Sequence, residues 1–205
     1  MAISRIILLT GEAEGDVLSG ELREHNPDLD VKIAHTSADL AETASLIDQS
    51  TRLLSFCTSV IVPAEYLSRL PGPAYNFHPG PPERPGRYPS VFALFDMDPQ
   101  FGITIHEMAP LVDSGAIVSA NWFDIPENCD LLELESITLI RLVNEFRRIA
   151  PYLARFSAPL PHTDVTWAGR KTTKADCDNL CRITEDMSPQ EITHRKRCCG
   201  VHTSQ

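Results

Sequence analysis

The chain has 205 residues, of which 42% are hydrophobic and 22% are charged. These proportions are typical of a globular protein with a packed core, and they exclude wholesale disorder. The net charge of −10 disfavours broad binding to nucleic acid, because an acidic surface is repelled by phosphate backbones. Small substrates, or a local basic pocket for an anionic substrate, remain compatible with this charge.

The first apolar run covers only residues 6–9. It is too short for a membrane span or for the apolar part of a signal peptide, and it predicts a first buried strand. We therefore expect a cytoplasmic protein that does not associate with membranes.

Apolar, β-branched runs separated by Gly and Pro predict strands that alternate with helices. The expected strands cover 5–10, 31–34, 53–62, 74–78, 101–108 and 115–123. The expected helices cover 16–24, 36–48, 63–70, 91–96 and 131–156, the last of which has an apolar stripe along one face. This alternation indicates an α/β fold that is Rossmann-like, with a largely parallel sheet and flanking helices.

The composition changes after Phe156. Residues 157–164 contain two prolines and predict a linker, and the remaining residues are polar and weakly periodic. We therefore expect a main domain over 1–156, followed over 157–205 by a linker and a short C-terminal extension. The extension is too small to bury a core of its own.

Four of the six cysteines lie close to the C-terminus. Without a secretory signal, reduced thiols are the default expectation. The four cysteines also lack the spacing of a standard zinc site, so we expect ordinary thiols and no metal. These residues are Cys177, Cys181, Cys198 and Cys199.

The segment Asn76-Phe77-His78 closes a predicted strand just before a proline-rich loop. Side chains two apart on a strand point the same way, so Asn76 and His78 are expected to project together. Ligands of parallel α/β sheets bind at the carboxyl ends of the strands. The sequence thus predicts an amide and an imidazole side by side at the carboxyl end of a strand, where ligands bind.

Asp113 lies in a turn between two later predicted strands. A carboxylate beside an imidazole holds the ring in one tautomer, and the pair can move protons in an acyl transfer. An Asn side chain can donate a hydrogen bond to a developing oxyanion. The same residues also have a purely structural interpretation, because Asn-x-His pairs fix loops and Asp-Ser-Gly is a common turn.

The order of these motifs along the chain favours the catalytic interpretation over the structural one. The segment 76–118, with Asn76, His78, a proline-bearing loop, Thr104 and Asp113, resembles the catalytic segment of the formyltransferase superfamily. That superfamily includes the sugar-nucleotide N-formyltransferases, methionyl-tRNA formyltransferase and glycinamide ribonucleotide transformylase. The resemblance covers residues 53–156, about half of the chain.

The resemblance implies a catalytic triad of Asn76, His78 and Asp113, with 10-formyltetrahydrofolate as the formyl donor. It also implies that the pterin of the donor is held largely by backbone groups of two segments. These are Ser59, Val60, Ile61 and Val62, and Ala109, Pro110, Leu111 and Val112.

Four further residues are candidates for binding the acceptor. Arg84, Arg87 and Tyr88 lie in the loop after His78 and either clamp an anionic acceptor or remain solvated. His106 shares a strand face with Thr104 and either lines the pocket or has a structural role.

The sequence also departs from the family pattern. The part of the chain that precedes Asn76 is short. In addition, the first turn carries Glu12 and Glu14 at the place where the family holds a phosphate, and these carboxylates disfavour a ribonucleotide acceptor. The expected acceptor is the amine of a small molecule, conceivably an amino sugar on a nucleotide. Two alternatives remain open: a formyltetrahydrofolate hydrolase that uses water, and a non-catalytic folate-binding or regulatory module.

Overall fold

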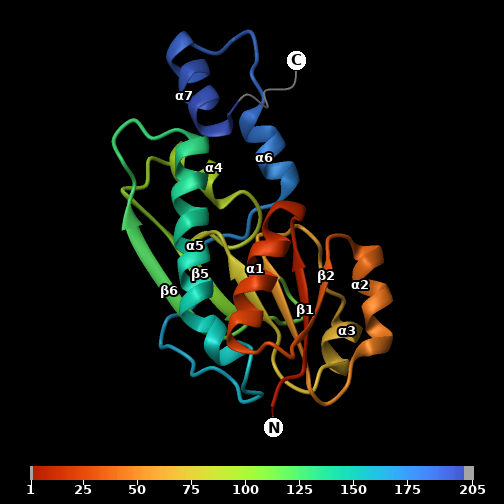
Figure 1. The fold of residues 1–205 in the computed structure, drawn as a ribbon. Helices are drawn as coiled ribbons and strands as arrows, with labels where there is room; N and C mark the ends of the chain where they lie inside the picture. The colour runs from red at the N-terminus through yellow and green to blue at the C-terminus, as the bar shows by residue number, and fades with distance from the viewer. Residues whose placement is uncertain (1, 201–205) are drawn as a thin grey trace. The chain divides into compact units, whose positions relative to one another are not determined.

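The computed structural model describes residues 2–200 and contains one six-stranded sheet, in the order β2-β1-β3-β4-β5-β6. The predicted α/β fold with a largely parallel sheet and flanking helices is confirmed (Figure 1). The strands are β1 (Arg5–Thr10), β2 (Asp30–Ala34), β3 (Thr51–Phe56), β4 (Tyr75–His78), β5 (Gln100–Glu107) and β6 (Ile117–Asp124). The helices are α1 (Glu12–His25), α2 (Ser37–Thr43), the short 3₁₀ helix η1 (Ala44–Leu46), α3 (Ala64–Arg69), α4 (Pro89–Phe95), α5 (Leu131–Leu153), α6 (Lys174–Cys181) and α7 (Pro189–Cys199).

The first four strands are parallel, and β1 lies between β2 and β3. The direction reverses at β5: the Met108 N–H, just after β5, donates to the Ala74 carbonyl, just before β4, over 2.8 Å. The chain reverses again into β6, where the Glu107 N–H donates to the Ala116 carbonyl over 2.9 Å. The reversal at β5 positions the functional site described below.

The chain divides into two compact units that are interleaved along the sequence. The first unit comprises Met1–His78, Ile105–Ser119 and Leu142–Asp164, and the second comprises Pro79–Thr104, Ala120–Arg141 and Val165–Gln205. Neither unit coincides with the predicted segments 1–156 and 157–205. That boundary therefore stays a prediction.

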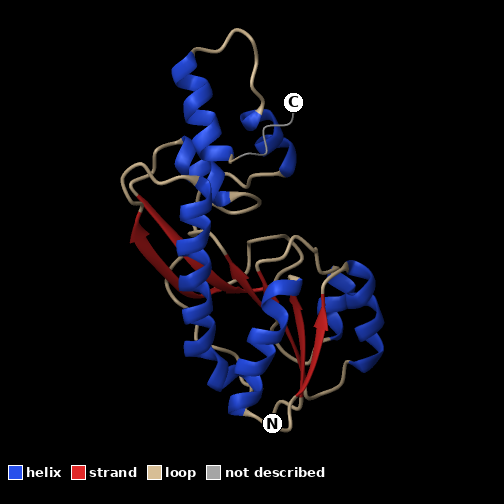
Figure 2. Ribbon diagram, turned by 45° about the horizontal axis from the view of Figure 1, so that its top comes forward, coloured by secondary structure: helices blue, strands red, loops and turns tan. Residues whose placement is uncertain are grey.

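The sheet of the first unit buries apolar side chains on both faces. On one face Ile7 and Leu53 pack in a cluster with Leu40 from α2 and Tyr66 from α3. On the other face the rings of Phe56 and Phe77 lie 5.9 and 5.1 Å from the ring of Phe146, in α5. Figure 2 shows α1 on the same side as α5, and an ion pair of 3.1 Å between Glu21 and Arg147 joins the two helices. The near-continuous burial of β1 and β3 follows from this double covering.

The second unit has a core of its own, to which the C-terminal residues contribute. Val91 and Leu94 of α4 cluster with Phe101, Phe123, Leu134 and the buried Cys198. The weakly periodic tail thus forms two helices, α6 and α7, and α7 packs on both α4 and α6. Each helix begins at a capped residue, Thr173 and Ser188, whose hydroxyl accepts a backbone N–H of the first turn.

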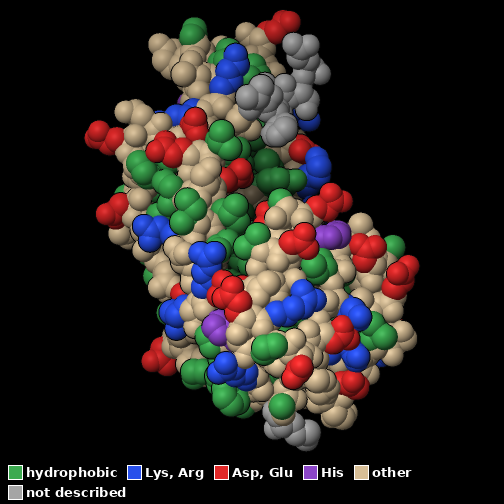
Figure 3. All heavy atoms as spheres, in the orientation of Figure 1, with side chains coloured by type: hydrophobic (Ala, Val, Ile, Leu, Met, Phe, Trp, Pro, Cys, Tyr) green, Lys and Arg blue, Asp and Glu red, His purple; other side chains and the backbone are tan. Residues whose placement is uncertain are grey.

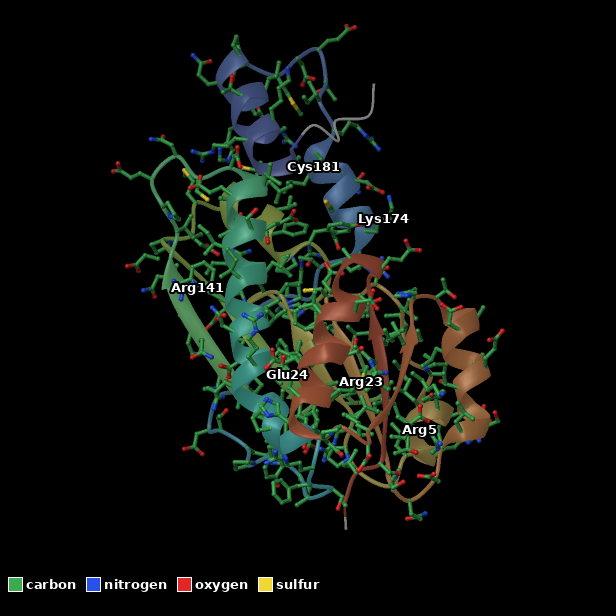
Figure 4. All side chains as sticks on the ribbon, in the orientation of Figure 1. Arg5, Arg23, Glu24, Arg141, Lys174 and Cys181 are labelled. Carbon is green, nitrogen blue, oxygen red and sulfur yellow. A yellow bond between two sulfur atoms is a disulfide. The ribbon has the colours of Figure 1, made fainter. Side chains whose placement is uncertain are left out.

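The expectation of reduced thiols throughout the tail is wrong. Cys181 and Cys199 form a disulfide that joins α6 to α7, with their Cα atoms 5.8 Å apart. Figure 4 labels Cys181 on α6. The capped helices bring the two cysteines together, and the linear spacing of the cysteines does not reveal this. Cys177 and Cys198 remain free thiols, and burial raises the pKa of each.

Several predicted boundaries are also wrong. The predicted strand 53–62 ends at Phe56, because Cys57 adopts the left-handed conformation with φ 49° and breaks the strand. The first helix begins at Glu12 rather than at residue 16, with two acidic residues in its first turn. The helix predicted over 36–48 ends at Thr43 and is followed by the 3₁₀ turn.

Charged side chains of both signs are interspersed on the face of the first unit drawn in Figure 3. Many are paired: Arg5, labelled in Figure 4, donates to Asp30 over 2.9 Å and to Asp48 over 3.0 Å. Within residues 2–200, no helix combines the length and the apolar character needed to cross a membrane.

Arg52 is a buried charge in the sheet of the first unit, and it anchors the segment that follows α5. Its guanidinium donates to four backbone carbonyls and lies 5.6 Å from the centre of the Tyr75 ring. The four carbonyls belong to Leu153, Phe156, Ser157 and Ala158. Carbonyls at a helix C-terminus lack partners within the helix, so Arg52 satisfies groups that burial would otherwise leave unpaired.

We expect Arg52→Met to lower the free energy of unfolding by about 2–4 kcal/mol, because several buried carbonyls lose their donor. Urea denaturation measures this loss. Arg52→Lys keeps the charge but not the planar fork, so it should recover only part of the loss. An unfolding midpoint of Arg52→Met equal to that of the wild type would show that the four hydrogen bonds contribute nothing.

Candidate active site

Asn76 and His78 project from one face of β4, as predicted, while Tyr75 and Phe77 are fully buried. In the parallel register of β3 and β4, Asn76 lies beside Ser55. Both strands belong to the first unit. Asn76, His78 and Ser55 thus place polar side chains beside one another on two neighbouring strands of the sheet.

His106 lies opposite Asn76, because β5 runs antiparallel to β4. The Asn76 Nδ2 and His106 Nε2 atoms are 3.1 Å apart. His106 is 2% exposed and Asn76 is half-buried, so this contact is only partly accessible to water. His106, which was predicted to bind the acceptor, therefore contacts Asn76 directly and belongs to the polar cluster.

Asp113 completes the cluster from the turn between β5 and β6. Its carboxylate lies 3.3 Å from His106 Nε2 and 3.7 Å from His78 Nδ1, and all three side chains are buried. Asp113 has φ 46°, a left-handed conformation that Asp tolerates better than most residues. The structure thus brings together Asn76, His78 and Asp113, with His106 between them.

The hydrogen bonds of His106 define what its ring can do. Its Nδ1 lies 2.8 Å from the Glu107 carbonyl, which can only accept, so Nδ1 carries a proton. With its proton on Nδ1, the ring can accept a hydrogen bond from the Asn76 amide at Nε2. The His106 Nε2 atom thus lies within 3.3 Å of both the Asn76 amide and the Asp113 carboxylate.

A pocket of the first unit opens onto this cluster. The predicted donor-binding residues Val60, Ile61, Val62, Ala109, Pro110, Leu111 and Val112 line it together with Asn76, His106 and Asp113. Ser59 does not line it. The pocket also contains Ser55, Thr58 and Met108, which the sequence analysis missed. The parallel pairing of Ser55 with Asn76 identifies Ser55, but that pairing is not readable from the sequence alone.

Neither protein-family models nor curated proteins match the chain. Solved structures do. A 4-N formyltransferase from Francisella tularensis is 19% identical with a TM-score of 0.71, over 95% of this chain and 87% of that one. A sugar N-formyltransferase from a Shewanella species is 16% identical with a TM-score of 0.73, over 95% and 87% of the two chains. An N-formyltransferase from Helicobacter canadensis, in complex with folinic acid and dTDP-3-aminofucose, is 14% identical with a TM-score of 0.69, over 96% and 80%.

The chain has the formyltransferase fold. At these identities the likeness establishes the fold, as the resemblance implied. The roles of individual residues rest on the geometry described above.

Three predicted acceptor-binding residues, Arg84, Arg87 and Tyr88, belong to the second unit of this formyltransferase fold. Arg84 is bound by two carboxylates, those of Asp96 and Asp98. Burial alone would lower the pKa of its guanidinium, but the two carboxylates together outweigh burial and raise that pKa. Tyr88, with φ 59°, immediately precedes α4. A role of these three residues in acceptor binding stays a prediction.

Within the described part of the chain, no group of three or more His, Cys, Asp or Glu side chains has an arrangement that could hold a metal ion.

Gly115 allows the turn that carries Asp113 to approach β5. A Cβ atom at this position would overlap the Glu107 carbonyl, the same group that accepts from His106. Any side chain at residue 115 must displace the turn, the end of β5, or both.

We therefore expect Gly115→Ala to lower the free energy of unfolding by about 1–3 kcal/mol, because a backbone group blocks the added methyl group. Gly20→Ala, in the exposed interior of α1 where the methyl group meets no atom within 4 Å, is the matched control. It should instead raise stability by about 0.5–1 kcal/mol. Equal effects of the two substitutions in urea denaturation would contradict the close approach.

Proposed function

We propose that this protein transfers a formyl group from 10-formyltetrahydrofolate to the amine of a small acceptor, an amino sugar carried on a nucleotide. The observation that carries the proposal is the convergence of the half-buried Asn76 with the buried His78, His106 and Asp113 in one cluster beside a pocket. The shared fold supports it, since one protein with this fold was crystallised with folinic acid and an amino sugar nucleotide.

The pocket suits a folate donor in its chemistry. Ile61, Leu111 and Val112 line it, yet their side chains are 55%, 71% and 39% exposed. Large apolar side chains exposed around one pocket mark a binding surface for an apolar ligand. The enclosed volume is about 70 Å³, below the roughly 300–1,000 Å³ of sites that surround a whole small ligand. We infer that most of the donor lies over these exposed side chains rather than inside the pocket.

The donor supplies a formyl carbon attached to a folate nitrogen. Attack of the acceptor nitrogen on this carbon places negative charge on the formyl oxygen. The Asn76 amide has a second N–H besides the one that faces His106, and it donates to that oxygen together with His78. As the carbon–nitrogen bond to the folate breaks, the proton lost by the acceptor amine is passed to the folate nitrogen, and Asp113 and the imidazoles beside it carry that proton. The products are the N-formylated acceptor and tetrahydrofolate.

The separation of Asp113 from His78, 3.7 Å, exceeds an ordinary hydrogen bond. Catalytic contacts are often long in ligand-free enzymes and shorten when the substrate binds. Burial of both side chains strengthens their electrostatic interaction, because little water screens it.

Asn76→Ala and His78→Ala should each lower the rate of formyl transfer by at least about a hundredfold, because each removes an oxyanion or proton-transfer contact. The assay detects the formylated acceptor by mass spectrometry over a panel of amino sugar nucleotides. Asn179→Ala, on the exposed surface of α6, is the control and should retain the wild-type rate.

The same assay separates the alternatives. Release of formate without any formylated product would establish a formyltetrahydrofolate hydrolase that uses water. Neither product would indicate a non-catalytic module, and calorimetry with a folate analogue would then distinguish a folate-binding module from one that does not bind folate. Near-normal turnover of Asn76→Ala and His78→Ala would contradict the catalytic roles of these residues.

Leu111→Asp should weaken binding of a stable folate analogue at least about tenfold, because it replaces apolar contact area at the pocket with a charge. Isothermal titration calorimetry measures the dissociation constant. Val17→Asp, at a side chain on α1 that is 55% exposed, is the matched control and should leave affinity unchanged. Equal affinities of the wild type and Leu111→Asp would exclude this surface as the donor site.

A further inference from the structure

The second unit contains a cavity that the proposed formyl transfer does not use. It encloses about 730 Å³ and is lined only by residues of the second unit. This volume falls in the range of sites for small organic ligands, roughly 300–1,000 Å³. The cavity is therefore large enough for a small organic ligand.

Large apolar and aromatic side chains contribute to the lining of the cavity. These are Phe92 and Phe95 of α4, Leu180 of α6 and Trp122 of β6. Trp122 is 41% exposed, which is unusual for a side chain of its size. Its Nε1–H donates to Glu83 over 3.2 Å, and this hydrogen bond restricts the orientation of the indole.

Polar groups around the same cavity form a connected network. Arg84 donates to both carboxylate oxygens of Asp98 over 2.7–2.8 Å and to Asp96 over 2.6 Å. Gln100 donates to Asp124 over 2.8 Å. Carboxylate and amide oxygens retain lone pairs beyond the one used in a single hydrogen bond, so this rim offers a fixed set of acceptors.

The charge of the lining disfavours phosphate. Three carboxylates face the cavity against two guanidiniums, and both guanidiniums are bound by carboxylates, Arg84 as above and Arg170 by Asp176 over 3.0 Å. A nucleotide diphosphate would meet unbalanced negative charge there. The ligand is therefore uncharged or carries an amine.

A ligand with one apolar face and a rim of hydroxyl groups satisfies all of these features. A pyranose ring has this form: its axial C–H groups stack on an aromatic face, and its equatorial hydroxyls donate to carboxylate and amide oxygens. We propose that the second unit binds a carbohydrate, with one sugar ring stacked on Trp122 and its hydroxyls directed to Glu83, Asp96 and Gln100. This proposal does not rest on the proposed formyl transfer.

The test uses the two tryptophans of the chain as reporters. In ¹H–¹⁵N spectra of the full chain, with the Trp122 and Trp167 indole signals assigned through Trp167→Phe, glucose, glucosamine, N-acetylglucosamine and maltose are titrated to millimolar concentration. We expect at least one sugar to shift the Trp122 signal and leave that of Trp167 in place. Saturation-transfer spectra should show the strongest effect on the ring C–H protons of the sugar.

Matched variants separate stacking from folding. Trp122→Ala should weaken binding at least about tenfold, whereas Trp122→Phe keeps an aromatic face and should retain most of it. Asn76→Ala, in the first unit, should bind the sugar like the wild type. Loss of sugar binding and loss of formyl transfer are thus distinguishable.

Several results would overturn the proposal. These are the absence of saturation transfer to every sugar tested, unchanged affinity in Trp122→Ala, and a shift of the Trp122 signal by thymidine diphosphate or choline where no sugar produces one. The last result would assign the cavity to a nucleotide or to a quaternary ammonium ligand. Trp122→Phe serves as the binding test if Trp122→Ala does not fold, and complete loss of binding in a folded Trp122→Phe would contradict a stacked ring.

Discussion

The carboxylate of Asp113 lies between two buried imidazoles, and this arrangement depends on the reversal of the chain at β5. Because β5 runs antiparallel to β4, His106 lies directly opposite Asn76. The tight turn at the end of β5 then returns Asp113 to the same place, within 4 Å of both rings. If β5 ran parallel to β4, a long crossover connection would have to precede it. The turn that carries Asp113 would then lie at the opposite end of the strand. Gly115 and the left-handed Asp113 are the local conditions that let the turn close.

Much of this architecture is predictable from the sequence, because strong local patterns determine it. The strand at 5–10 and the strand that carries Asn76 and His78 were found because apolar runs end at Gly or Pro. The end of β3 was missed because residues 57–62 are apolar in composition but irregular in backbone, and only the conformation of Cys57 reveals the break. His106 was noticed, yet its place between Asn76 and Asp113 follows from strand pairing, which single-sequence patterns do not encode.

The tail shows the same limit. Its residues are polar, and their periodicity is too weak to predict a packed helix. Residues with the spacing of helix caps indicate the helices of the tail better than the periodicity does. Thr173 with Asp176, and Ser188 with Glu191, both have the spacing of a helix start, and both pairs do begin helices. Which cysteines then approach each other is decided by how α6 and α7 pack. No spacing rule could have selected Cys181 and Cys199 among the four.

The bond between Cys181 and Cys199 closes a loop with a sequence separation of 18. Closing a loop of this length restricts the unfolded chain and favours the native state by about 3 kcal/mol in the chain-entropy model. Cys199 also belongs to the apolar core that contains Phe101 and Phe123. The packing of that core is therefore coupled to the thiol–disulfide balance of the surroundings, and the same chain resists opening and proteolysis better under oxidising than under reducing conditions.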